Sequence, residues 1–123
     1  MTTAAATPDG LPRSAAVADI AIAAITASEL LVGVELADAD RRGSREATVH
    51  AILEAFDILP FDLDVARHHA ALLAHTRRTG RPRGAHELQI AATARAAGRL
   101  LVATDHAAFD DLPGVSFRPA ARG

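Results

Sequence analysis

The chain has no cysteine and almost no aromatic side chains, and each shortage excludes a class of function. Without cysteine, its 123 residues can form neither a disulfide framework nor a thiolate metal site, and a cysteine nucleophile is excluded. Aromatic residues make up 3% of the chain, so base stacking cannot be the main mode of binding a nucleic acid. The sequence also lacks an apolar run of about 18 residues, the length that a membrane-spanning helix needs.

The chain has no large excess of charge of either sign. Its formal net charge is −2 at pH 7, which argues against a protein that binds nucleic acid or membranes through a polybasic surface. All 13 basic residues are arginine, whose planar guanidinium group can bind a phosphate or carboxylate through two parallel hydrogen bonds. The first residues lack the basic start and apolar centre of a secretory signal, so we expect a cytoplasmic protein.

Short apolar segments alternate with longer helical ones along the chain. This alternation predicts βαβ units and hence an α/β fold with a parallel sheet covered by helices. We expect a flexible tail over 1–15, one domain over 16–119 and a short tail over 120–123. Asp62 and Gly80 are suited to cap the two ends of the third helix. The expected strands are 18–26, 56–62, 99–104 and 115–118, and the expected helices are 27–40, 41–56, 62–80 and 86–97.

Three acidic residues fall at the carboxyl edge of such a sheet, where ligands bind in open α/β folds. Glu29 and Asp105 each follow a predicted strand. The last predicted helix runs antiparallel to the strand that it feeds, so its first turn, with Glu87, lies at the same edge. Carboxylates brought together repel one another, and Mg²⁺ removes that conflict while it keeps several waters and binds phosphate oxygens. Taken singly, each acid also has an ordinary explanation as a helix-capping or turn residue.

Three segments of the sequence carry a resemblance to a known family: "ITASELLVGVELA", "ILPFDLDVARHHAALLAHTRRTGRPRGAHELQIAATARAAG" and "LLVATDHAAFDDLPGV". In order and spacing they resemble the PIN-domain toxins of the VapC type. The similarity extends over residues 18–117. It is specific, because the acid before "LLVGV", the Gly–Pro–Arg loop before "QIAATA" and the "TD…F…LPG" pattern occur together.

The resemblance implies a PIN-like three-layer α/β/α fold and a toxin with endoribonuclease activity that depends on Mg²⁺ or Mn²⁺. Toxins of this family are usually homodimers that a VapB-type antitoxin neutralises. By the resemblance, Glu29, Glu87 and Asp105 match acidic positions of the family and would be the catalytic residues that bind the metal. Thr104 lies beside Asp105, where family members often have a polar residue, and is a candidate substrate contact.

The sequence departs from the family pattern near its N-terminus and at position 87. Family members begin with an apolar strand that ends in an aspartate and lies in the centre of the sheet. Nothing before residue 17 matches that strand, and Asp9, in "TPDG", has the context of a turn residue, so the first strand and first acid are expected to be missing. Glu87 stands where the family usually has aspartate, and Ala108 replaces a further acid.

The departures leave alternatives to an active toxin. The chain could be a truncated or degenerate PIN-like module without catalysis that only dimerises or binds antitoxin. Another segment or another chain could instead supply the missing strand.

Two surfaces of the predicted fold are candidates for binding a partner. Arg77, Arg78, Arg81 and Arg83 lie within seven residues, next to Glu87, and are candidates to bind RNA phosphates or the acidic tail of an antitoxin. The alternative is a solvated helix end, where arginine complements the helix dipole. The apolar segment 30–34 and the helix that follows it are candidates for a dimer face or an antitoxin groove, unless they only form core.

Overall fold

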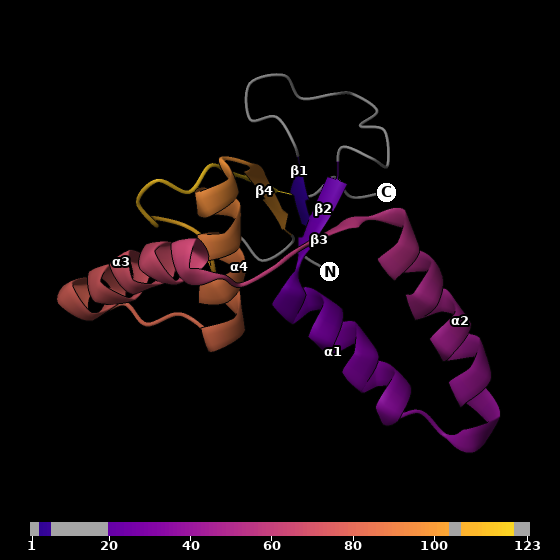
Figure 1. The fold of residues 1–123 in the computed structure, drawn as a ribbon. Coiled ribbons are helices and arrows are strands. Elements are labelled where there is room, and N and C mark those ends of the chain that lie inside the picture. The colour runs from indigo at the N-terminus through magenta and orange to yellow at the C-terminus, as the bar shows by residue number, and fades with distance from the viewer. Residues whose placement is uncertain (1–2, 6–19, 104–106, 120–123) are drawn as a thin grey trace.

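Five short strands form one sheet with the order β3-β2-β1-β4-β5 in the part of the chain that the structure describes (Figure 1). This structure is a computed structural model, and it describes residues 3–5, 20–103 and 107–119. The strands are β1 (Thr3–Ala5), β2 (Ile20–Ala23), β3 (Asp57–Leu59), β4 (Leu100–Ala103) and β5 (Phe117–Pro119). The helices are α1 (Ala24–Glu35), α2 (Ala39–Ala55), α3 (Leu63–Thr79) and α4 (Ala85–Ala97).

The central strand of the sheet comes from a segment that we expected to be a loose tail. Ala4, in β1, pairs antiparallel with Ala21 of β2 and with Leu101 of β4. The expectation of a tail over 1–15 is therefore wrong at residues 3–5, and the expectation of a missing central strand is corrected too. The centre of the sheet is filled, but by a strand that runs opposite to its neighbours, so the sheet is mixed. Threonine and alanine at this position show no alternation of polar and apolar residues, which is why the pattern did not predict a strand.

The other four strands share one direction. β3 pairs parallel with β2, and β5 pairs parallel with β4. Because β1 is antiparallel to both β2 and β4, those two strands also point the same way. The parallel α/β arrangement predicted from the sequence is thus confirmed for these four strands, and it places their carboxyl ends at one edge of the sheet.

Most of the predicted element boundaries agree with the structure to within a few residues. The helix predicted over 27–40 ends earlier, at Glu35, and so does the strand predicted over 18–26. This strand ends at Ala23, and α1 begins at Ala24 without a loop between them. Alanine has the highest helix propensity of all residues, so "AITA", residues 24–27, forms helix rather than strand. The caps of α3 are confirmed: the Asp62 side chain accepts a hydrogen bond from the Val65 amide at 3.0 Å, and Gly80 has a φ of 68°.

The core lies between the sheet, α3, α4 and the segment before β5. The α4 helix packs against α3, β2 and β4, and its small side chains permit this close approach, with Ala91 and Ala92 fully buried. Phe109 and Leu112 close the core from the segment that follows β4. The Gly98 residue, with a φ of 65°, ends α4 and lets the chain turn back into β4 at once. The antiparallel course of α4 and β4 expected from the sequence follows from this turn.

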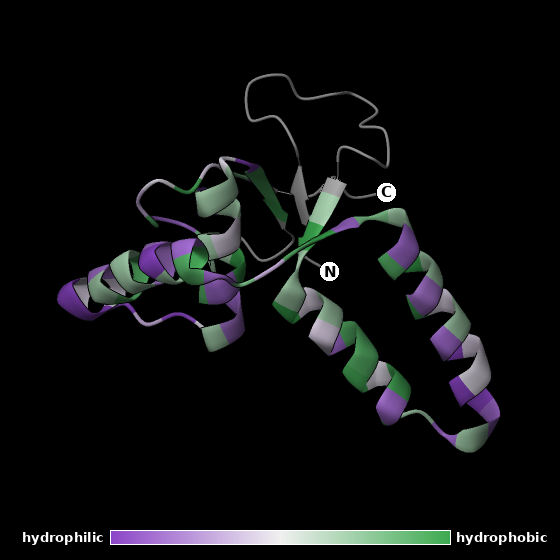
Figure 2. Cartoon of the chain, in the orientation of Figure 1, coloured by the Kyte–Doolittle hydropathy of each residue, from purple (hydrophilic) through white to green (hydrophobic). Residues whose placement is uncertain are grey.

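The α1–α2 hairpin projects away from this core (Figure 1). Only Val49 is buried among the 17 residues of α2, and only Thr26 and Val34 in α1. Hydrophobic residues in the second half of α1 contrast with the many hydrophilic residues of α2 (Figure 2). Leu31 and Val32 are 46% and 49% exposed, so the apolar segment 30–34 is mostly not core. Among the described residues, no helix combines the length and the apolar character needed to cross a membrane.

We predict that Leu72→Ala lowers the free energy of unfolding by about 2–5 kcal/mol, because Leu72 is fully buried in the core and its truncation leaves a cavity. Leu63→Ala, on the same helix, is the matched control: Leu63 is 67% exposed, so its truncation should change stability by less than about 0.5 kcal/mol. Urea denaturation followed by circular dichroism measures both. Equal losses in the two variants would contradict the placement of the core.

Candidate active site

The carboxyl edge of the sheet is where the candidate acids are expected to meet. The β2 strand ends at Ala23 and leads directly into α1, while β4 ends at Ala103 and leads into residues 104–106. Since these two strands point the same way, both exits lie at this edge. The α4 helix begins at the same edge because it runs antiparallel to β4. Three segments that are far apart in the sequence therefore converge here.

An ion-pair contact joins two of these segments. The Nδ1 atom of His86, in the first turn of α4, lies 3.4 Å from Oε2 of Glu29 on α1, and both side chains are 50% exposed. This contact confirms that Glu29 lies beside the first turn of α4. Because α1 begins earlier than predicted, Glu29 is in its second helical turn and not in the first. A half-exposed pair of this kind contributes little to stability. Because half of its surface is exposed, the Glu29 side chain remains accessible to other ligands.

Glu87 lies one residue further along α4 and bends back over the start of the helix. A Cβ added at Gly84, the N-cap of α4, would overlap the Glu87 carboxylate. This is the position from which the third residue of a helix reaches back toward its N-cap, where the helix dipole favours a negative charge. The side chain is half-buried. The carboxylate thus lies at the N-terminal end of α4, and this placement keeps it at the carboxyl edge.

The remaining predicted site residues at this edge, Thr104 and Asp105, lie outside the residues that the structure describes. Within the described ranges there is no group of three or more histidine, aspartate or glutamate side chains that could hold a metal ion. Glu29 and Glu87 nevertheless offer accessible carboxylate oxygens of the kind that Mg²⁺ prefers, and Mg²⁺ needs only one or two carboxylates from the protein. The donor chemistry at this edge therefore fits the ion.

One polar group at the edge was not among the predicted site residues. Thr26 of α1 is 4% exposed, and its buried hydroxyl group has no hydrogen-bond partner among the residues that the structure describes. A buried hydroxyl of this kind normally has a partner, which is often an ordered water. The only sequence signal was a threonine within the otherwise apolar "AIAAITA", which is too weak to identify a functional residue.

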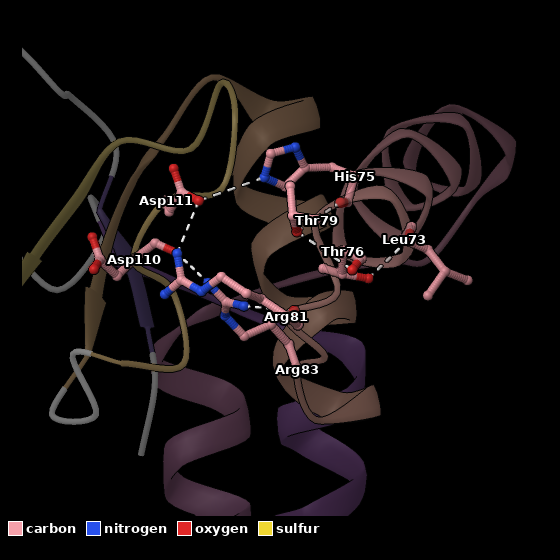
Figure 3. A network of polar contacts seen from close by, with 8 residues as sticks. All are labelled: Leu73, His75, Thr76, Thr79, Arg81, Arg83, Asp110 and Asp111. Carbon is pink, nitrogen blue, oxygen red and sulfur yellow. Dashed lines mark hydrogen bonds and ion pairs between the residues drawn. The ribbon is translucent and has the colours of Figure 1, made fainter.

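The four candidate arginines separate into two groups in the structure. The Nη1 atom of Arg81 donates to Oδ2 of Asp111 at 3.0 Å, and Nη2 of Arg83 donates to the carbonyl of Asp110 at 2.5 Å. His75 on α3 also faces Asp111, with its Nε2 3.8 Å from the same carboxylate oxygen (Figure 3). We call these five residues the Arg–Asp clamp. Arg77 and Arg78 are exposed at the end of α3 and form no ion pair with any other residue in the described ranges.

Comparison with known proteins identifies the class of this fold. Residues 9–115 match the family model of the PIN domain. A structure of VapBC-5, a toxin–antitoxin system of Mycobacterium tuberculosis, superposes with a TM-score of 0.72. The two sequences are 33% identical, and the match covers 81% of this chain and 81% of that chain. The DNA-bound VapBC of Salmonella typhimurium has a TM-score of 0.74 and is 27% identical, with 79% of this chain and 72% of that chain covered.

Two curated relatives place the chain more closely. The tRNA(fMet)-specific endonuclease VapC of Salmonella typhimurium is 30% identical over 94 residues, and the protein of that name from Shigella flexneri is 29% identical over the same length. In both cases the match covers 76% of this chain and 70% of the relative. The chain therefore belongs to the PIN-domain family and, within it, to the VapC-type toxins, as the three sequence segments predicted.

We predict that Gly84→Ala lowers the free energy of unfolding by about 1 kcal/mol, because alanine is a poor N-cap and its Cβ would displace the Glu87 carboxylate. Gly43→Ala is the matched control. A Cβ at Gly43, inside α2, meets nothing within 4 Å, so alanine there should raise stability by roughly 0.5–1 kcal/mol. Thermal unfolding of the two variants should show shifts of opposite sign, and an increase for both would contradict the placement of Glu87.

Proposed function

We propose that this chain is an endoribonuclease toxin that hydrolyses RNA phosphodiesters with Mg²⁺ or Mn²⁺. The observation that carries the proposal is the convergence of Glu29 and the first turn of α4 at the carboxyl edge, seen in the contact between Glu29 and His86. The relatives named tRNA(fMet)-specific endonucleases support the substrate class, so initiator tRNA is the first RNA to test. A homodimer, which the resemblance implies, and a cytoplasmic location, expected from the lack of a signal pattern in the first residues, belong to the same proposal.

In this proposal Glu29, Glu87 and Asp105 hold the metal ion. When bound, the ion supplies an activated water at neutral pH and neutralises charge on the phosphate. The residues of the chain hold the ion and bind the substrate. Glu29 and Glu87 lie at one edge on different helices, and the buried Thr26 hydroxyl is a donor for an ordered water. Arg77 and Arg78, exposed in the last turn of α3, attract the RNA backbone. Thr104, next to Asp105, remains a candidate contact for the substrate.

The test is cleavage of initiator tRNA by the purified chain in the presence of Mg²⁺. We expect cleavage that EDTA abolishes, and we expect Glu29→Gln and Glu87→Gln each to lower the rate by at least about a hundredfold, because a displaced ligand misplaces the reacting groups. Gel electrophoresis of end-labelled tRNA measures the rate. Glu46→Gln, at an exposed acid on α2, is the matched control and should cleave at the unaltered rate. If the unaltered chain and all the variants cleave the tRNA at the same rate, or if none of them cleaves it, catalysis by this chain is rejected.

We further propose that a VapB-type antitoxin neutralises the chain by placing an apolar segment between α1 and α2. A cavity of about 490 Å³ lies between these helices. Its walls include apolar Leu31, Val34 and Leu53, with Glu35 and Glu46 alongside. An apolar groove with acidic neighbours fits an amphipathic helix that carries a basic residue. The structures of VapBC complexes from the relatives support an antitoxin as the partner.

We expect Leu31→Glu to weaken binding of a VapB-type antitoxin by more than about tenfold, because it places a charge in an apolar contact. Leu31 is already 46% exposed, so the fold should tolerate the change. Leu36→Glu, at a residue that is 79% exposed at the tip of the hairpin, is the matched control and should bind as before. Isothermal titration calorimetry measures both affinities. Equal binding by the two variants would exclude this groove.

A second candidate function is a module without catalysis that only dimerises or binds antitoxin. The reversed central strand β1 favours this candidate, because in the family this strand ends in an acid at the carboxyl edge. An antiparallel β1 instead directs its carboxyl end to the opposite edge. Antitoxin binding together with absent tRNA cleavage would establish this second function.

A further inference from the structure

The Arg–Asp clamp joins three parts of the chain that lie far apart in the sequence. Arg83 uses two nitrogens of its guanidinium group: Nη2 binds the Asp110 carbonyl, and Nη1 binds the Arg81 carbonyl at 2.7 Å. Arg81 and His75 both face the Asp111 carboxylate. The clamp therefore links the end of α3 and the α3–α4 connection to the segment that follows β4 (Figure 3).

In the sequence, the residues of the clamp flank the predicted acid of α4, Glu87, and position 105 after β4. Arg83 directly precedes Gly84, the N-cap over which Glu87 is bent, and Asp110 follows position 105 by five residues. The two hydrogen bonds of Arg83 set the distance between the Arg81 and Asp110 carbonyls. They therefore fix the start of α4 relative to the segment that leads away from β4.

The clamp contributes little to holding the segment on the core. Phe109 and Leu112, on either side of the two aspartates, are 2% and 5% exposed, so their burial already anchors the segment. The pair of Arg81 and Asp111 is about half exposed, at 52% and 54%, and such pairs stabilise a fold weakly. Asp111 has a φ of 63°, a strained conformation for a residue with a side chain, and this conformation is kept where its carboxylate meets Arg81 and His75.

We infer that the Arg–Asp clamp positions the acids at the carboxyl edge, and that Arg83 is a positioning residue and not a contact for RNA. This inference rests on the proposed function. It divides the four arginines by role: Arg81 and Arg83 are used inside the chain, whereas Arg77 and Arg78 are exposed and remain for RNA phosphates. The Nε of Arg83 is buried, which also removes it from a backbone phosphate.

The test measures Mn²⁺ binding to the full chain without RNA, by the electron paramagnetic resonance signal of free Mn²⁺. Arg83→Lys keeps the charge but cannot bind two carbonyls at once through a planar group. We expect Arg83→Lys and Arg83→Gln each to weaken Mn²⁺ binding by about 10–100-fold, the usual effect of losing a group that orients metal ligands. Arg78→Gln removes the same charge from an exposed site and should leave Mn²⁺ binding unchanged.

The salt dependence of RNA binding is the second measurement, with Mg²⁺ absent. Arg78→Gln should reduce the slope of the logarithm of the binding constant against the logarithm of salt concentration by about 1, as for a lost phosphate contact. Arg83→Gln should leave that slope unchanged. If Arg83→Gln lowers the slope and leaves Mn²⁺ binding intact, Arg83 is an RNA contact and the inference is overturned. If Arg83→Lys binds Mn²⁺ as the unaltered chain does, the charge alone suffices and the inference is also overturned.

Thermal unfolding separates positioning from loss of the fold. The Arg83 variants should remain folded at the temperature of the binding measurement. If one of them unfolds, Asp111→Asn takes its place, because it keeps the shape of the side chain. We expect Asp111→Asn to weaken Mn²⁺ binding severalfold. Unchanged Mn²⁺ binding by a folded Asp111→Asn would then count against the clamp. If the unaltered chain binds no Mn²⁺, the proposed function fails and the role of the clamp fails with it. If the unaltered chain binds Mn²⁺ and only the variants behave against expectation, the clamp alone fails.

Discussion

The backbone pairing of β1 with both β2 and β4 is the constraint on which the rest of the structure depends. Because β1 is antiparallel to each of them, β2 and β4 must point the same way. Their carboxyl ends then share an edge, and the helices that begin there inherit this position. The contact between Glu29 and His86 is a consequence of this arrangement. A three-residue strand thus determines where the candidate site lies.

The structure consists of a packed core and an exposed α1–α2 hairpin, and the two suit different functions. Leu72, Leu101 and two alanines of α4, Ala91 and Ala92, bury their side chains fully, which makes a rigid support for the start of α4. The α1–α2 hairpin buries few residues and leaves a groove lined by apolar and acidic side chains. Rigid support suits a site that holds carboxylates in place, and an unfilled apolar groove suits a partner helix. The carboxyl edge and the groove share α1, so a partner in the groove would lie close to Glu29.

Much of the fold followed from local patterns in the sequence. Hydrophobic periodicity predicted the four helices, and Asp62 and Gly80 marked the ends of α3 because capping is decided within a few residues. The boundary between β2 and α1 was missed because alanine and isoleucine are compatible with either state. The β1 strand was missed for a different reason: its stability comes from hydrogen bonds to residues 20–21 and 100–102, and nothing in Thr3–Ala5 itself indicates them.

The sequence by itself determined the family, through the three segments that resemble VapC-type toxins, and the α/β class, through the alternation of strand and helix patterns. It also predicted that Glu29 and Glu87 lie at one edge, but the strand directions that create this edge are fixed by the pairing of β1. Only the tertiary structure decided what the arginines contact. Arg81 and Arg83 are separated from Asp111 and Asp110 by 30 and 27 positions, so no local pattern could pair them. The fold alone brings those groups within hydrogen-bonding distance, and it alone leaves Arg77 and Arg78 exposed.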